Sequence, residues 1–136
     1  MKKFLILIIL LVSCENSLIE EIKETHTNGN PKLIHYKKST GDTLVLFKIM
    51  NYHENGNIKE EESYKDNKLE GKQISYYDNG NIYSERNYKN GKKEGQWEGY
   101  WKNGNRAFEG TYNSGLRVGT WVQCYPNGNV RSKKKF

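Results

Sequence analysis

The chain contains few of the residues from which reactive sites are usually built. It has only three histidines and two cysteines among its 136 residues. His26, His35 and His53 do not share a spacing typical of metal ligands. No second usable cysteine is present for a zinc site or a nucleophilic pair. We therefore expect no catalytic residue, no bound metal and no cofactor.

Long apolar runs are also scarce, and the one that opens the chain is short. Residues 4–12 form an unbroken apolar run of nine, which follows Lys2 and Lys3 and ends at the small residue Ser13. A helix needs about 20 apolar residues to cross a membrane. A positive start followed by a short apolar run is typical of a secretory signal. We predict that residues 1–13 are a signal peptide.

The residues around Cys14 resemble the lipobox of bacterial lipoproteins. Leu11, Val12 and Ser13 come directly before Cys14. The resemblance implies cleavage before Cys14 and lipidation of its thiol and amino group, and it implies that the protein is anchored by lipid in a bacterial cell envelope. The resemblance does not decide whether the anchor lies in the outer or the cytoplasmic membrane. The alternative is an ordinary signal peptide with an incidental cysteine.

Positive charge is not concentrated along the chain. The formal net charge is +6, and removal of the signal peptide would lower it by the two charges of Lys2 and Lys3. The remaining basic residues alternate with acids, except in the terminal run 133–135. This pattern is typical of a solvated surface and not of a nucleic-acid stripe. We expect no nucleic-acid partner.

What the sequence does contain is a repeat. The tripeptide Asn-Gly-Asn begins at Asn55, Asn79, Asn103 and Asn127, so three successive gaps are 24 residues, and a drifted copy begins at Asn28. A fixed period of this length indicates units that bury their apolar side chains only against neighbouring units.

Each repeat reads as two strands joined by turns, which predicts an all-β fold. Asn-Gly is the preferred pair for a two-residue type I′ turn, so we place tight turns at the tripeptides and a longer loop over residues 89–94. Aromatic residues recur in register and should form columns across an antiparallel sheet. The opposite face should be polar, and its regularly spaced Glu61, Glu85 and Glu109 look like a structural rung, not an acid and base pair.

Two further segments complete the domain organisation. Residues 14–31 are polar and acidic near their start, and we interpret them as a tether with one helical turn around residues 18–22. Residues 32–37 and 43–52 flank a turn at residues 39–42, which predicts a first hairpin. The repeat domain is therefore expected over residues 32–136.

The repeated residues resemble the bacterial variant of the MORN repeat. The motif is Gly-x-Trp, then an aromatic pair, Asn-Gly, Glu and Tyr, and it is carried by Gly95, Trp97, Tyr100, Trp101, Asn103, Gly104, Glu109 and Tyr112. The resemblance implies antiparallel hairpins stacked into an elongated sheet, no established catalytic activity, and for many bacterial members an antitoxin label. The chain departs from the motif at Gln73, where the tryptophan is missing, and at Cys124.

Two binding interpretations stay open. In the first, the array is a protein-interaction module or a scaffold, of which an antitoxin-like inhibitor is one version. In the second, an aromatic platform stacks on wall or surface glycans. The candidate partner-binding residues are the same in both and are all aromatic: Tyr77, Trp97, Trp101, Trp121 and Tyr125.

The lipid anchor is directly testable. We predict that Cys14→Ser leaves the precursor uncleaved or releases the protein into the soluble fraction, because no thiol remains to carry the lipid. Detergent should be needed to extract the unaltered protein, and mass spectrometry should find added mass at Cys14. Unaltered protein that is wholly soluble and carries no such mass would exclude the anchor.

Overall fold

The computed structural model describes residues 17–136, which form one sheet. Its ten strands follow one another in chain order, and every neighbouring pair is antiparallel. The predicted all-β array of successive hairpins is confirmed. The strands are β1 (Leu18–Thr25), β2 (Pro31–Thr40), β3 (Thr43–Tyr52), β4 (Ile58–Lys65), β5 (Lys68–Tyr76), β6 (Ile82–Lys89), β7 (Lys92–Tyr100), β8 (Arg106–Asn113), β9 (Leu116–Cys124) and β10 (Val130–Lys135).

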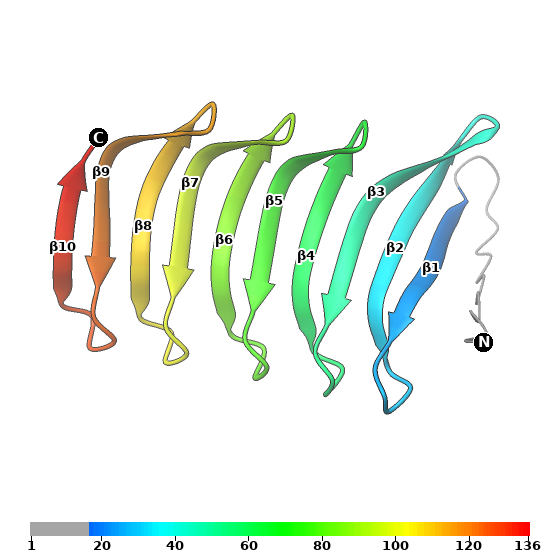
Figure 1. The fold of residues 1–136 in the computed structure, drawn as a ribbon, viewed down its shortest axis with the longest axis horizontal. Helices are drawn as coiled ribbons and strands as arrows, with labels where there is room; N and C mark the ends of the chain where they lie inside the picture. Colours follow the sequence, from blue (N-terminus) through cyan, green and yellow to red (C-terminus); the bar gives the residue numbers. More distant parts are fainter. Residues whose placement is uncertain (1–16) are drawn as a thin grey trace.

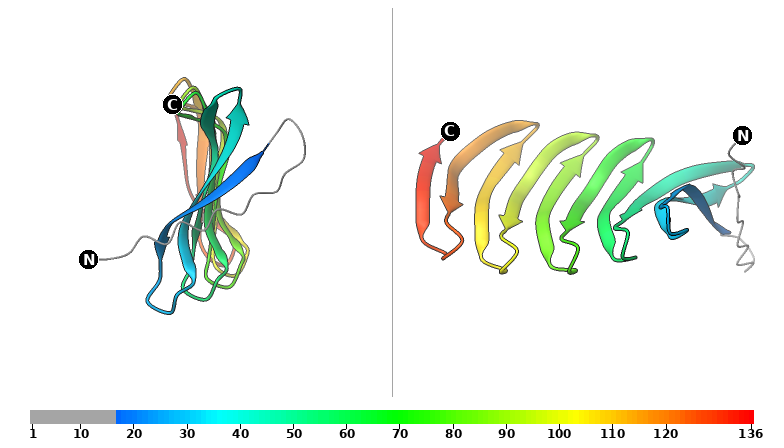
Figure 2. Two further views of the ribbon diagram at one scale, coloured as in Figure 1. Left: turned by 90° about the vertical axis from the view of Figure 1, so that its right-hand side faces the viewer. Right: turned by 60° about the horizontal axis from the view of Figure 1, so that its bottom comes forward.

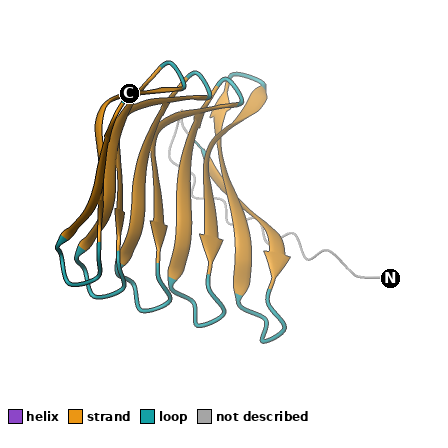
Figure 3. Ribbon diagram, turned by 60° about the vertical axis from the view of Figure 1, so that its left-hand side comes forward, coloured by secondary structure: helices purple, strands orange, loops and turns teal. Residues whose placement is uncertain are grey.

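The hairpins stand side by side in a single layer (Figure 1). β1 lies at one end of the row and β10 at the other, and the edge-on view in Figure 2 shows β1 rotated away from the later strands. Turns line both long sides of the sheet (Figure 3). Within residues 17–136 no helix is long and apolar enough to cross a membrane.

The tight turns lie on the opposite side of the repeat from where we predicted them. Asn90 and Gly91 join β6 to β7 with φ of 50° and 78°. Asp66-Asn67 and Ser114-Gly115 likewise have two successive positive φ angles. Such pairs are the central residues of type I′ turns. The segment expected to be a longer loop is therefore the tight turn.

The Asn-Gly-Asn tripeptides form longer loops instead. At Tyr77 the amide donates to the carbonyl of Asn81 over 2.8 Å, and the amide of Gly80 donates back to Tyr77 over 3.0 Å. Gly80 has φ of 86°, whereas Asn79 is not in the left-handed region. This is a three-residue loop in which a type I turn is followed by a left-handed glycine. Asn79 accepts a local hydrogen bond from the amide of Asn81 over 3.1 Å, which favours this geometry over the two-residue turn.

The sheet begins earlier than the sequence predicts. Residues 18–25, which we expected in a polar tether with a helical turn, form β1 and pair with β2 through contacts such as Ile22 with Ile34. Adjacent Glu20 and Glu21 break the apolar–polar alternation of a strand, and they are tolerated because β1 has a partner on one side only among the described strands and leaves most of its side chains partly exposed. The predicted first hairpin is present as β2 and β3. The predicted signal peptide and Cys14 lie outside the described residues.

Few side chains are buried, because no second layer covers either face of the described sheet. Ile34 and Met50 pair across β2 and β3, and Trp97 and Tyr112 pack together in β7 and β8. Cross-strand pairing, followed from β3 to β7, connects Met50 to Glu98 on one face of the sheet. Glu98 is next to Trp97 in the sequence. Successive residues point to opposite faces. The two buried clusters therefore lie on opposite faces, called here the acidic face (with Glu98) and the aromatic face (with Trp97).

The repeat unit defines which deletions the sheet tolerates. Deletion of residues 79–102 joins Asp78 to Asn103, rebuilds the loop sequence and removes one complete hairpin, so we predict a folded protein. Deletion of residues 79–90 alone removes β6 and reverses the direction of the next strand against β5, so we predict aggregation through unpaired edges. Circular dichroism melting and size-exclusion chromatography should separate the two. Equal melting of both would contradict a hairpin array.

Candidate functional site

One column of rings crosses the aromatic face, with one ring from each strand of the second half. Tyr88 of β6 lies 5.6 Å from Trp97 of β7, and Trp97 lies 4.6 Å from Tyr112 of β8, measured between ring centroids. Trp121 of β9 follows at 5.0 Å and Phe136 at 6.4 Å. The predicted column is confirmed. The rings meet tilted or edge to face, the arrangement that aromatic pairs prefer.

Two glycines make room for these rings. A Cβ placed on Gly110 would lie 2.1 Å from the ring of Trp121, and one placed on Gly99 would lie 2.2 Å from the ring of Phe108. No side chain fits at such distances. Gly99 and Phe108 face each other across β7 and β8, so the ring folds over the backbone of its neighbour.

Cationic side chains lie over the ring column and shield it from solvent. The ammonium of Lys93 lies 4.8 Å from the centroid of Trp97 and 5.0 Å from that of Tyr112. The guanidinium of Arg117 lies 4.6 Å from Trp121. Cations over aromatic faces are attracted by the ring quadrupole, by about 0.5–1 kcal/mol at exposed sites.

These groups line a hollow of 460 Å³, which we call the basic hollow. The described residues that line it include no acid, and none of its cations forms an ion pair with another described residue. The residues that define the hollow are Lys93, Trp97, Tyr112, Arg117, Trp121 and Lys134.

The positive potential of the hollow changes the acidity of Tyr112. Burial of the phenol raises its pKa, but Arg117, whose Nε donates to the Tyr112 hydroxyl over 3.3 Å, and nearby Lys93 outweigh burial. The pKa of Tyr112 therefore lies below its ordinary value of 10.0. A group that stabilises a nearby phenolate will also stabilise a carboxylate bound in the same place.

A second column of side chains, called here the loop column, lies at the Asn-Gly-Asn loops and joins each repeat to the next. The Trp101 indole N–H donates to the carbonyl of Cys124 over 3.1 Å, and the Tyr77 hydroxyl donates to Tyr100 over 2.8 Å. His53 and His26 occupy the same loop position and place Nε2 at 3.0 Å and 2.9 Å from the carbonyls of Tyr76 and Tyr52. A carbonyl only accepts, so in each histidine Nε2 carries the proton.

The asparagines form a parallel set of links between loops. The side-chain amides of Asn103 and Asn105 both donate to the carbonyl of Pro126, over 2.7 Å and 2.8 Å. Asn55 and Asn57 donate to Asp78 in the same way. The tripeptide therefore shapes its own loop through its glycine and holds the next loop through its asparagines.

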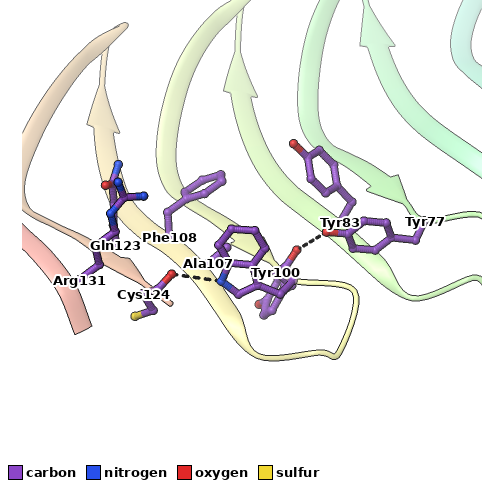
Figure 4. A pocket seen from close by; sticks show the side chains of 9 residues that line it. Tyr77, Tyr83, Tyr100, Ala107, Phe108, Gln123, Cys124 and Arg131 are labelled. Carbon is purple, nitrogen blue, oxygen red and sulfur yellow. Dashed lines mark hydrogen bonds between the residues drawn. The ribbon is translucent and has the colours of Figure 1, made fainter. Parts of the chain in front are cut away.

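Beside this loop column lies a second hollow, of 230 Å³, which we call the tyrosine hollow. Figure 4 shows Tyr77, Tyr83 and Tyr100 on one side of it and Phe108 on another, with the two hydrogen bonds to the next repeat as dashed lines. Tyr83 is 45% exposed and Trp101 36%. Phe108 lines both hollows.

Carboxylates of the acidic face form ion pairs and hydrogen bonds across the strands. Glu98 and Glu109 pair directly across β7 and β8 and share Arg106. Glu61 accepts a hydrogen bond from the Tyr76 hydroxyl over 2.7 Å and pairs with Lys48 at 3.0 Å. Burial and then the Glu61 carboxylate raise the pKa of Tyr76 to about 12, so its hydroxyl keeps its proton as a donor. Within the described chain no group of three or more acids, histidines or cysteines could hold a metal.

The structure divides the five predicted partner-binding residues between the two columns. Trp97 and Trp121 lie in the basic hollow, and Tyr77 and Trp101 line the tyrosine hollow. Tyr125 takes the last position of the loop column, 49% exposed and covered by Arg131 at 5.8 Å from its ring centroid. They do not form one continuous platform.

Several residues of these sites were missed in the sequence. For His26 and His53 the sequence indicated only that a metal-ligand spacing is absent, yet their spacing matches that of Asn28 and Asn55 and marks them as loop residues. Lys93 and Arg117 lie 24 residues apart, which is the repeat period. Gln73, which replaces tryptophan, ends the ring column and donates to Glu62 over 2.6 Å.

The fold and the two columns define a protein whose described residues form one layer of β-hairpin repeats. Three segments, residues 49–66, 69–90 and 93–114, match the family model described as the MORN repeat variant. The matches support a MORN-repeat protein, and repeats of this kind are generally non-catalytic scaffold or interaction modules. Comparison with curated proteins and with solved structures gave no match.

The exposed fractions of Trp97 and Trp101 distinguish a buried structural ring from one that a partner could contact. We predict that Trp97→Ala, at 7% exposure, lowers stability by about 3–5 kcal/mol, because a buried ring is lost. Trp101→Ala, at 36% exposure, should cost far less, since it removes one hydrogen bond and partial packing. Urea unfolding followed by circular dichroism measures both, with Trp101→Phe as a control that keeps the ring. Equal losses for Trp97→Ala and Trp101→Ala would contradict this assignment.

Proposed function

We propose that the protein is a lipid-anchored scaffold of a bacterial cell envelope that binds an acidic segment of another protein at the basic hollow. The observation that carries this proposal is the hollow itself, where three cations lie over four aromatic rings without an acid among the described residues that line it. A negatively charged partner would complete the ion pairs that the chain itself leaves open.

The proposed anchor places the sheet close to the membrane. Only Glu15, Asn16 and Ser17 separate Cys14 from the start of β1 at Leu18. With β1 part of the sheet, a long tether is not available, so the end with β1 would be held at the lipid surface. The hollow lies among β7, β8, β9 and β10, at the other end of the row, where a partner can approach it.

A polypeptide fits the basic hollow for two reasons. Carboxylates of aspartate and glutamate can pair with Lys93 and Arg117, while apolar side chains of the same segment pack on the rings of Trp97 and Trp121. Aromatic and arginine side chains are also those most enriched at the centres of protein interfaces. The antitoxin-like role is one version of this function, in which the bound protein is inhibited.

A second candidate function is favoured by the tyrosine hollow. Tyr83 and Trp101 are partly exposed there beside Tyr77 and Phe108. Such rings can stack on sugar faces, so this hollow is where a wall or surface glycan would bind. The indole N–H of Trp101 already donates a hydrogen bond to the carbonyl of Cys124. A ligand could therefore contact the face of the Trp101 ring but not its N–H.

Binding of a poly-glutamate peptide tests the first candidate. We expect saturable quenching of tryptophan fluorescence, at least tenfold weaker (about 1.4 kcal/mol) in Lys93→Glu/Arg117→Glu. The matched control is Lys89→Glu/Lys92→Glu, which makes the same charge change at exposed residues outside the hollow. Added salt should weaken the unaltered complex because the charges are partly exposed.

The same titration distinguishes the candidates. Equal binding by both double variants would contradict the basic hollow as the site. Wall glycan that quenches fluorescence saturably, and no longer does so in Trp101→Ala with unchanged melting, would instead support the glycan function. The melting temperature of every variant must be measured beside its affinity, so that unfolding is not taken for loss of binding.

A further inference from the structure

The sheet is open at both ends. Among the described residues β1 has β2 as its only partner strand, and β10 has only β9. Each outer edge therefore presents backbone amides and carbonyls that no described strand pairs. Free edges of this kind are templates for pairing with another chain.

The links between loops are directional, and they leave complementary groups at the two ends. In each internal repeat the loop donates to the loop that follows, as Asn103 and Asn105 donate to Pro126. The last loop carries the same donors on Asn127 and Asn129, but the described chain has no further loop to accept them. The first loop is the reverse case. Thr27 occupies the position of the acceptors Glu54, Asp78 and Pro126, and among the described residues no earlier loop donates to it.

Strand direction is also compatible with continuation. Neighbouring strands alternate in direction through the whole sheet, and every Asn-Gly-Asn loop lies on the same side. If a second copy continues the row, its β1 runs antiparallel to β10 of the first copy, as β9 does. The last loop of the first copy then lies beside the first loop of the second, at the spacing that the internal loops already use.

The charges of the two edges are opposite. β10 carries Arg131 and the lysines 133–135 without an acid, and all its residues are exposed. β1 carries Glu20, Glu21 and Glu24 against Lys23. Glu21 pairs with Lys23 and Lys37, and Glu24 with Lys32, but Glu20 forms no ion pair with a described residue. Lysines on a free edge discourage pairing with a like edge, and here they favour an acidic one.

We propose that copies of this chain associate head to tail, with β10 of one copy pairing with β1 of the next. The contact is heterologous, so it extends the sheet into a row of more than two copies instead of closing a dimer. It pairs the edges of the sheet, and of the residues that define the basic hollow only Lys134 lies on β10, so it goes beyond the proposed function and can fail or hold independently of it. For anchored copies the row must run along the membrane surface.

A charge-swap experiment tests this arrangement. The full chain, kept in a mild non-ionic detergent because of its apolar start, is followed by sedimentation velocity over a range of concentrations. We expect its sedimentation coefficient to rise with concentration and to fall on addition of salt. Lys133→Glu/Lys134→Glu/Lys135→Glu and, separately, Glu20→Lys/Glu24→Lys should each weaken association at least tenfold, since each gives like charges on the two edges that must meet.

A mixture of these two variants provides the decisive result. In the mixture the acidic β10 of one variant meets the basic β1 of the other, so association should return. Circular dichroism melting of each variant controls for folding. Unaltered protein that stays monomeric at about 200 μM, variants that associate like the unaltered protein, or a mixture that stays monomeric would each overturn the head-to-tail contact. Binding of poly-glutamate by Glu20→Lys/Glu24→Lys, which leaves every residue of the basic hollow unaltered, would leave the proposed function standing.

Discussion

A sheet of one layer has no second layer against which to bury its apolar side chains, so its cohesion depends on contacts between neighbouring repeats. In the second half of this chain the ring column from Tyr88 to Phe136 supplies such contacts. The rings lie across the strands, so each repeat completes the packing of the one before it. Stability then resides in the interfaces between repeats as much as within them.

The hydrogen bonds of the loops follow the same constraint. Trp101 and Tyr77 each donate to a carbonyl of the next repeat, and Asn103 and Asn105 do the same. Along the side of the sheet that carries the tight turns, the Glu94 carboxylate accepts a hydrogen bond from the amide of Ser114 in the following turn over 2.7 Å. Val118 takes this position in the last repeat, where no described turn follows. Because all these links point forward, the two ends of the array cannot be equivalent.

The same side chains that hold the array together also create its surface. Lys93 and Arg117 screen the rings from water, and because no described acid pairs with them they leave the aromatic face positively charged at the basic hollow. The acidic face is different, since Glu98 and Glu109 there share Arg106. Cations that pack on the rings of the thin sheet thus give the basic hollow its charge, and this charge is the feature on which the proposed acidic partner depends.

The sequence alone determined the repeat, the all-β class and the aromatic columns, because a fixed period places equivalent residues at equivalent positions whatever the turns are. It did not determine which turn was tight, since Asn-Gly also fits a three-residue loop that ends in a left-handed glycine. At Asn79 the hydrogen bond from the Asn81 amide favours that loop. Only the tertiary structure brought residues 18–25 into the sheet and grouped Lys93, Arg117 and Lys134 over the rings. Those groupings depend on register between strands, which no single repeat encodes.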